Sequence, residues 1–283
     1  MNGKEPLVLD GGTGSELARR GVRSPVAWSA RAAEEAPQLL SSIHRAWLRA
    51  GADVLTTNTF SAARFVLEAA GCRDPLAVQK TSVEIAVQAA ASFDRPVLLA
   101  GSLSNFPPCF STAAYPSAER EVESYRELAQ VLAEKVDVLI LEMIEDVRHA
   151  ERLYAAAAET GLPLWVGVSL RSSRGRLHPY DFPAEALTPV LETVASWRPD
   201  LLALMHTPVV DVKSGLRVLP KPEGCALGVY PEVEDESPEA LVRAVVEWSL
   251  DDEIALVGGC CGSKEEHVRA LRRWVDSREG GDF

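Results

Sequence analysis

The sequence has little positive charge and no long hydrophobic run, and both absences exclude classes of partner. Its 29 Lys and Arg against 41 Asp and Glu give a net charge of −12. Nucleic acid and anionic membrane surfaces bind to basic faces, so neither partner is expected. No run reaches the roughly 18 apolar residues that span a membrane, and no apolar signal segment precedes the first strand-like run. We therefore expect a cytoplasmic protein.

The sequence also lacks the regular cysteine spacing of a disulfide framework. In a reducing compartment, a cysteine serves more often as a metal ligand or a small buried hydrophobe than as half of a cross-link. Cys72 and Cys109 fall near a helix end and in a long loop, and we interpret both as structural. Cys260 and Cys261 differ from these because they are adjacent and flanked by glycines.

The segment 258–262 reads Gly-Gly-Cys-Cys-Gly and follows the apolar run 254–257. Adjacent cysteines do not easily bond with each other, but both can reach one metal ion where glycines let the backbone turn sharply. Thiolates suit zinc. Cys260 and Cys261 are therefore predicted to be two ligands of a Zn²⁺ ion.

Short apolar runs alternate with amphipathic stretches of helical period, such as 118–135, 238–250 and 264–275. The alternation predicts parallel strands joined by crossover helices. Eight such units closing on themselves form a TIM (β/α)8 barrel, which typically takes roughly 250 residues. We predict a single-domain α/β barrel over residues 1–283. The expected strands are 7–10, 54–58, 97–102, 136–142, 164–169, 201–206, 226–230 and 254–258.

An open doubly wound sheet is the alternative fold. It is disfavoured because the sequence has no glycine-rich phosphate turn with a following acidic residue. Two connections break the regular pattern. Residues 102–116 read as a long loop, and residues 207–224 show at most a short helix. Long loops within a compact domain are often functional.

Polar side chains collect at the carboxyl ends of the expected strands, where barrel enzymes place their active sites. His206 ends the sixth run and is the best third metal ligand. Two cysteines and one histidine, with a free fourth position, form a catalytic type of zinc site. Cys225 is the alternative third ligand, although it begins the seventh run and would lie at the opposite mouth of the barrel.

Two carboxylates are candidate substrate ligands. Glu142 ends an otherwise apolar run, so it must be paired or face a cavity. We expect it to bind a substrate ammonium group, with an ion pair to a barrel arginine as the alternative. Asp10 precedes the glycine-rich turn 11–14, whose amides could approach a bound carboxylate. Capping of the helix that begins near Ser15 is an equally good interpretation of Asp10.

Taken in order, these motifs resemble the homocysteine S-methyltransferase family over nearly the whole chain. The resemblance begins with Asp-Gly-Gly-Thr-Gly at 10–14 and continues with Gly-Ala-Asp at 51–53, Thr-Thr-Asn-Thr-Phe at 56–60 and Leu-Glu at 141–142. It ends with the cysteine pair and His267. The resemblance implies a zinc-dependent (β/α)8 barrel in which Cys260 and Cys261 bind the metal. Glu142 would receive the homocysteine amino group, and Asp10 would lie beside the substrate.

The function that this resemblance implies is methylation of homocysteine to methionine, a step of methionine biosynthesis. Zinc would hold the substrate thiol as a nucleophilic thiolate. The expected methyl donor is a small sulfonium compound, S-methylmethionine or S-adenosylmethionine. We expect a monomer whose partners are these small molecules. The predicted substrate-binding residues are Asp10, Gly11, Thr13, Asn58 and Glu142, and the predicted metal ligands are His206, Cys260 and Cys261.

Two other functions stay open on the sequence. One is a zinc-dependent hydrolase or lyase acting on a related amino acid, with an activated water in the free zinc position. The other is a non-catalytic descendant that keeps the metal or ligand site.

The chain departs from the family pattern at three informative places. The family usually continues its third-strand motif with Gly-Pro, whereas this chain has Gly101-Ser102. The family's third zinc ligand is a cysteine after an asparagine, whereas this chain has Met205-His206. Imidazole in place of thiolate makes the site one unit less negative. The family's Tyr-Pro-Asn ends in Glu232 here. This extra carboxylate favours a cationic donor, and a solvated loop charge is the alternative interpretation.

Overall fold

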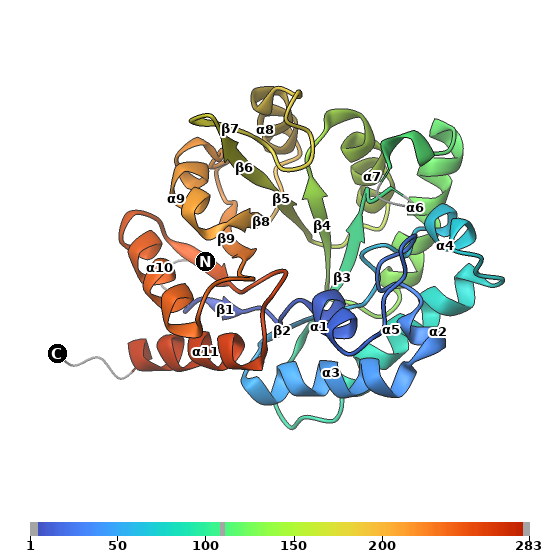
Figure 1. Cartoon of the computed structure of the whole chain (residues 1–283), viewed down its shortest axis with the longest axis horizontal. Coiled ribbons are helices and arrows are strands. Elements are labelled where there is room, and N and C mark those ends of the chain that lie inside the picture. The colour runs from blue at the N-terminus through green and yellow to red at the C-terminus, as the bar shows by residue number, and fades with distance from the viewer. Residues whose placement is uncertain (1–4, 108–110, 280–283) are drawn as a thin grey trace.

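Eight parallel strands form one sheet that closes into a barrel, with helices around its outside (Figure 1). The computed structural model describes residues 5–107 and 111–279, so Cys109 lies outside the described residues. Neighbouring strands follow the order β1-β10-β9-β8-β5-β4-β3-β2, and a parallel bridge from Leu9 to Val54 joins the two ends. The predicted TIM barrel is confirmed. The barrel strands are β1 (Leu7–Val8), β2 (Val54–Thr56), β3 (Leu98–Ser104), β4 (Val138–Ile144), β5 (Leu164–Val168), β8 (Leu201–Pro208), β9 (Ala226–Glu232) and β10 (Ile254–Val257).

The helices cover the outer face of the sheet through amphipathic faces. In α6, Ser117 accepts a hydrogen bond from the Arg120 amide as N-cap, and Tyr125, Leu128 and Leu132 are buried. The helices are α1 (Thr13–Arg19), α2 (Ala32–Glu35), α3 (Pro37–Ala50), α4 (Arg64–Ala69), α5 (Pro75–Ala90), α6 (Ala118–Ala133), α7 (Val147–Ala158), α8 (Leu187–Ser196), α9 (Val209–Val218), α10 (Pro238–Asp251) and α11 (Glu265–Glu279), with a 3-10 helix η2 (Thr112–Ala114).

Two elements differ from the expectations. An antiparallel hairpin of β6 (Leu170–Ser173) and β7 (Arg176–Pro179) follows β5. Its turn residues, Arg174 at φ 51° and Gly175 at φ 75°, both have the positive φ of a tight two-residue hairpin turn. The sequence analysis missed this hairpin because its strands are polar and carry no apolar run. The connection expected to hold at most a short helix contains α9, which has ten residues.

The core has two layers, one between the sheet and the helices and one inside the barrel. The inner layer includes Leu9, Met205 and Tyr230, which also line the cavity at the carboxyl ends of the strands. The barrel is therefore filled with side chains, as is usual for this fold. Its core forms the floor of the cavity.

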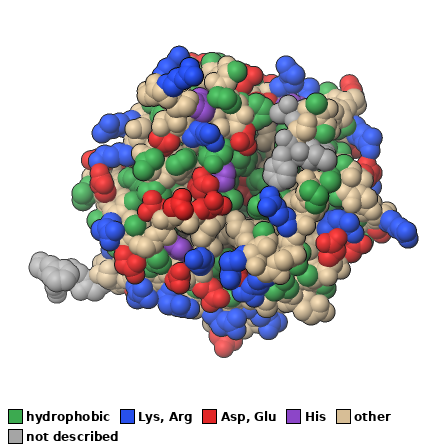
Figure 2. Space-filling view, in the orientation of Figure 1, with side chains coloured by type: hydrophobic (Ala, Val, Ile, Leu, Met, Phe, Trp, Pro, Cys, Tyr) green, Lys and Arg blue, Asp and Glu red, His purple; other side chains and the backbone are tan. Residues whose placement is uncertain are grey.

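Charge is spread over the surface. Figure 2 shows the lysines and arginines of one face scattered mainly around its rim, with acidic side chains between them and near its centre. This arrangement agrees with the acidic composition. Within the described ranges, none of the helices has the length and apolar character needed to cross a membrane.

A buried ionic cluster ties α6 and α7 to the segment that follows β3. Glu121 is fully buried and accepts a hydrogen bond from Arg152 at 2.6 Å, while its other oxygen lies 2.7 Å from Nδ1 of His149. The Tyr115 ring stacks on His149 with 3.6 Å between centroids, and its hydroxyl donates to the carbonyl of Asn105. The cluster therefore anchors a segment that borders the cavity.

We expect Glu121→Ala to lower the free energy of unfolding by about 1.5–3 kcal/mol, because it removes the buried carboxylate to which the partly buried Arg152 donates. Chemical denaturation measures the change. Glu247→Ala is the matched control, since Glu247 forms an exposed pair with Lys213 and should leave the midpoint almost unchanged. Equal losses in the two variants would contradict a structural role of the buried cluster.

Candidate metal centre and substrate cavity

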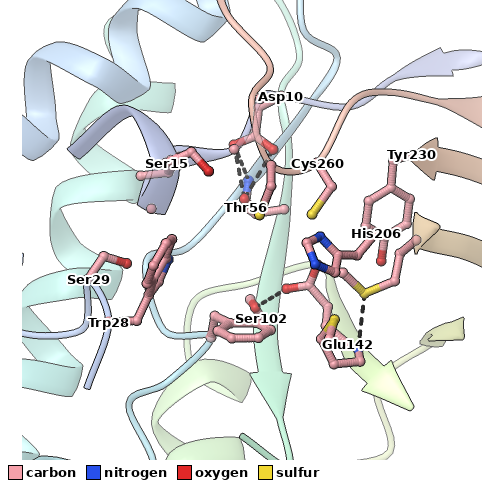
Figure 3. Close-up of a pocket in the computed structure, with 18 of the residues that line it drawn as sticks. Asp10, Ser15, Trp28, Ser29, Thr56, Ser102, Glu142, His206, Tyr230 and Cys260 are labelled. Atoms are coloured by element: carbon pink, nitrogen blue, oxygen red, sulfur yellow. Dashed lines mark hydrogen bonds between the residues drawn. The ribbon is translucent and has the colours of Figure 1, made fainter. Parts of the chain in front are cut away.

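A cavity of about 230 Å³ opens at the carboxyl ends of the barrel strands (Figure 3). Its lining comes from segments that are far apart in the sequence, and barrel closure brings them together. All eight residues predicted to bind substrate or metal line this one cavity: Asp10, Gly11, Thr13, Asn58, Glu142, His206, Cys260 and Cys261.

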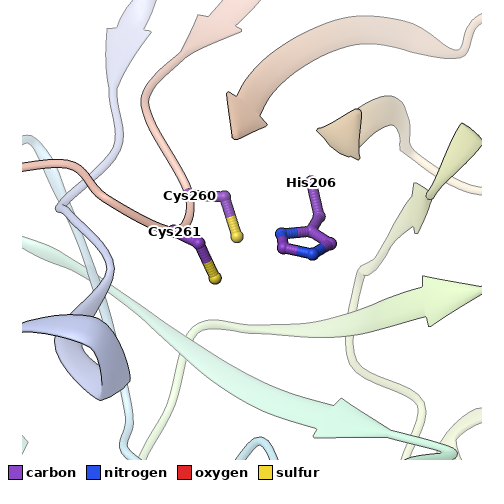
Figure 4. A group of neighbouring side chains, drawn as sticks. All are labelled: His206, Cys260 and Cys261. Atoms are coloured by element: carbon purple, nitrogen blue, oxygen red, sulfur yellow. The ribbon is translucent and has the colours of Figure 1, made fainter. Parts of the chain in front are cut away.

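Three of these side chains, His206, Cys260 and Cys261, form a group that fits a metal ion (Figure 4). Their candidate ligand atoms all lie within 4.8 Å of one another. The ligand atoms of one tetrahedral zinc ion are roughly 3.5–3.8 Å apart, so small adjustments would suffice. Nδ1 of His206 is buried without a hydrogen-bond partner, a cost that a bound metal would remove. Cys225 precedes β9 and does not belong to the group, so the alternative third ligand is wrong.

The electrostatics of the group favour a cation. The hydrogen bond from the Cys260 thiol holds the pKa of Cys261 well below its usual value, and His206 adds to this effect against the opposing influence of burial. The same bond, together with burial, holds the pKa of Cys260 well above its usual value. Burial alone would lower the pKa of His206, but the interaction with the nearby Cys261 raises it. The Cys261 thiol beside the imidazole therefore ionises more readily than an ordinary cysteine thiol.

His206 and Met143 both adopt the left-handed backbone conformation at the ends of their strands, with φ of 47° and 56°. Such a conformation costs a non-glycine residue roughly 1–3 kcal/mol and is concentrated at functional sites. The strand register also shifts after Met205 in β8 and after Leu141 in β4. Irregularities of this kind redirect a side chain at a barrel rim. Both residues line the cavity.

Asp10 follows β1 and is almost fully buried. Its carboxylate accepts hydrogen bonds from the Thr56 amide and hydroxyl, each at 3.0 Å. Burial raises the pKa of Asp10 well above its usual value, and the bonds from Thr56 oppose this. Helix α1 begins at Thr13 with Gly12 as N-cap and no side-chain cap. The capping interpretation of Asp10 is therefore wrong.

Glu142 lies on β4 and faces the cavity. The Ser102 hydroxyl donates a short hydrogen bond to its carboxylate. Desolvation by the surrounding protein raises the pKa of Glu142 to about 7, and the bond from Ser102 acts in the opposite direction. The alternative interpretation is an ion pair between Glu142 and a barrel arginine. No such pair is found among residues 5–107 and 111–279. This carboxylate therefore faces the cavity without an arginine partner among the described residues.

The side chains of Thr13 and Asn58 line the cavity but bond to protein groups. Thr13 accepts a hydrogen bond from the Trp47 indole at 3.1 Å. Asn58 accepts a hydrogen bond from the Ser29 hydroxyl and donates one to the Ser29 carbonyl, each at 2.9 Å. Both residues thus hold the loops that form the cavity wall.

The glycine turn after β1 touches the cysteine loop after β10. The Gly12 amide donates to the Ser263 hydroxyl at 2.7 Å. A Cβ atom at Gly12 would lie 2.6 Å from the carbonyl oxygen of Cys260, and one at Gly11 would lie 2.6 Å from the Trp47 ring. Only glycine permits this approach of the two loops.

The sequence analysis missed part of the cavity lining. Trp28, Phe60 and Phe106 contribute aromatic rings, and Asp181 adds a carboxylate. The rings of Phe60 and Phe106 are 5.4 Å apart. These residues lie in irregular segments outside the apolar runs. Only Phe60 carried a signal, as the last residue of the motif at 56–60.

Comparisons with known proteins identify the family. Residues 7–275 match the family described as homocysteine S-methyltransferase. The chain is 26% identical to betaine–homocysteine S-methyltransferase 1 of Danio rerio and 28% identical to that of Xenopus laevis, covering 99% of this chain and 75% of each relative. In fold it is similar to the metallated homocysteine methyltransferase MmuM of Escherichia coli, with a TM-score of 0.76 and 22% identity over 96% of this chain and 97% of that one.

The family match covers the first barrel strand, the last one and the cysteine pair. The fold similarity likewise extends over nearly the whole of both chains. The chain therefore belongs to the homocysteine S-methyltransferase family and is a methyltransferase.

Proposed function

We propose that the protein is a zinc-dependent enzyme that transfers a methyl group from a small sulfonium donor to the thiol of homocysteine. The observation that carries this proposal is one small cavity that contains both a His-Cys-Cys group and the Glu142 carboxylate. The first suits a metal that binds a thiol, and the second suits an ammonium group. Homocysteine carries both groups on one short chain.

His206, Cys260 and Cys261 would hold the zinc ion, which leaves a fourth position for the substrate. When bound, zinc would lower the pKa of the substrate thiol, so that the thiol is a thiolate at neutral pH. The apolar floor of Leu9 and Met205 excludes water from the core side of the acceptor sulfur. The protein thus presents the sulfur toward the open mouth of the cavity.

The amino-acid end of homocysteine would bind next to the metal ligands, between Glu142 and the glycine turn after β1. Glu142 receives the ammonium group, and the hydroxyl of Ser102 fixes the carboxylate for it. The backbone amides of the turn with Gly11 and Thr13 receive the carboxylate group. Asp10 supports this turn through its bonds to Thr56, and Asn58 through its bonds to Ser29.

Aromatic and acidic groups near the mouth favour a cationic donor. Trp28, Phe60 and Phe106 present ring surfaces, and Asp181 contributes negative charge. Aromatic faces and carboxylates attract sulfonium and ammonium cations. In the transfer, the bond from the acceptor sulfur to the methyl carbon forms as the bond from that carbon to the donor sulfur breaks. The electron pair stays on the donor, which leaves as a neutral thioether.

The other functions considered on the sequence lack a specific observation in their favour. Membership in a methyltransferase family disfavours a hydrolase, a lyase and a non-catalytic descendant. The monomeric state and the cytoplasmic location of the protein remain predictions from the sequence.

Zinc content tests the metal site. Wild-type protein prepared under reducing conditions should hold about one zinc ion per chain by elemental analysis, as expected for this donor set. His206→Ala should lose most of it after dialysis against a mild chelator. Cys225→Ala is the control and should retain wild-type zinc, because Cys225 lies outside the ligand group. Equal zinc in wild type and His206→Ala would rule out ligation by His206.

The role of Glu142 predicts a pH dependence. Only the carboxylate form binds the substrate ammonium, and the pKa of Glu142 is about 7 before a nearby metal cation lowers it. The kcat/KM for homocysteine should therefore fall with decreasing pH, with a midpoint at or below pH 7. Glu142→Gln should remove this limb and lower kcat/KM at pH 8 by about 30-fold or more, since losing a buried charge partner costs about 2 kcal/mol or more. Wild-type kcat/KM in this variant at pH 8 would contradict the proposed role.

If the aromatic residues Trp28, Phe60 and Phe106 bind the methyl donor, replacing one of them should change the KM for the donor selectively. Trp28→Leu should raise the KM for S-methylmethionine or S-adenosylmethionine by about tenfold, as loss of a desolvated cation–π contact implies. The KM for homocysteine should change little. Trp197→Leu is the control, because Trp197 stacks on Tyr154 away from the cavity lining. Methyl transfer from neither sulfonium donor would refute this part of the proposal.

A further inference from the structure

The β6–β7 hairpin places a tyrosine beside the third metal-ligand candidate. Tyr180 follows β7 directly, and its amide donates to the Ser169 carbonyl at 3.1 Å. Its ring centroid lies 4.6 Å from that of the His206 imidazole, with 48° between the ring planes. The hairpin therefore returns the chain to the rim of the cavity at His206.

Tyr180 is fixed from several sides. Its hydroxyl donates to Glu232 at the end of β9 at 2.9 Å. The next amide, of Asp181, donates at 2.6 Å to Glu145, which follows β4 and is almost fully buried. The guanidinium of Arg171 lies 4.9 Å from the ring centroid. The tyrosine ring thus has little freedom to move away from the imidazole.

His206 needs such support. Its backbone has a positive φ, and Nδ1 is buried without a partner. Metal-binding histidines are usually oriented by a carboxylate or carbonyl bonded to the second ring nitrogen. Within the described part of the chain, no carboxylate or carbonyl oxygen forms a hydrogen bond with this imidazole, and its ring contact is with Tyr180. The ring contact with Tyr180 is therefore the support that the structure shows for this imidazole within the described residues.

We propose that Tyr180 is a positioning residue that holds the His206 imidazole in the orientation that binds the metal, with Glu232 fixing the tyrosine. The proposal rests on the zinc site of the proposed function. His206 and Glu232 are also two of the positions at which the sequence departs from the family pattern, and Tyr180 contacts both of them. The hairpin therefore serves as the support of an unusual third ligand.

Zinc affinity, measured by competition with a chromophoric chelator, tests this role. Tyr180→Ala should weaken zinc binding by about 10- to 100-fold, the range found when groups that orient a metal ligand are removed. Tyr180→Phe keeps the ring and loses only the bond to Glu232, so its affinity should stay within about threefold of wild type. Tyr154→Ala, which removes a stacked tyrosine from the outer surface, should bind zinc like the wild type.

Cobalt(II) gives a second readout, because its visible absorption reports ligand geometry. The spectrum should change in Tyr180→Ala and stay unchanged in Tyr180→Phe and Tyr154→Ala. If Tyr180→Ala does not fold, Tyr180→Leu is measured in its place with the same expectation. If Tyr180→Ala binds zinc as tightly as the wild type and its cobalt spectrum is unchanged, the role of Tyr180 is overturned, but the proposed metal site is not. Absence of zinc binding by the wild type would overturn the proposed metal site as well.

Discussion

The closure of the barrel is the constraint on which the site depends. The bridge from Leu9 to Val54 joins the first and second strands, and β10 pairs with β1 on the other side. The turn after β1 therefore contacts the loop with the cysteine pair, at a distance that only glycine at position 12 allows. This contact places the glycine turn, which contains substrate-binding candidates, beside two of the metal-ligand candidates.

Buried carboxyl groups in the cavity and near it are the second property that shapes the site. Burial raises the pKa of Asp10, of Glu142 to about 7 and of Glu145 to about 8, because their charged forms are poorly solvated. Such groups are costly in the empty protein and gain most from a bound cation. Each ligand of the proposed reaction carries positive charge at one end: the metal, the ammonium of the acceptor and the sulfonium of the donor. Desolvation of these carboxyl groups thus favours the binding of all three cations.

Several features were predictable because they are local. The eight barrel strands appear as apolar runs, and α6, α10 and α11 appear as amphipathic periods that the structure confirms within a few residues. The β6–β7 hairpin left no such trace, since residues such as Arg174 and Ser172 are exposed and need no apolar pattern. Trp28 was missed for a related reason, because nothing local distinguishes a cavity-lining aromatic from any other loop residue.

The sequence by itself determined the barrel, the two cysteines and Glu142 as candidates, since strand periodicity and strand-end position are properties of short segments. Only the tertiary structure decided between His206 and Cys225, because the choice depends on which end of the barrel each residue occupies. It also decided that Asp10 bonds to Thr56 and caps no helix. The contact of Tyr180 with His206 required the tertiary structure too, because register shifts and loop closure direct side chains at a rim, and neither is encoded in local periodicity.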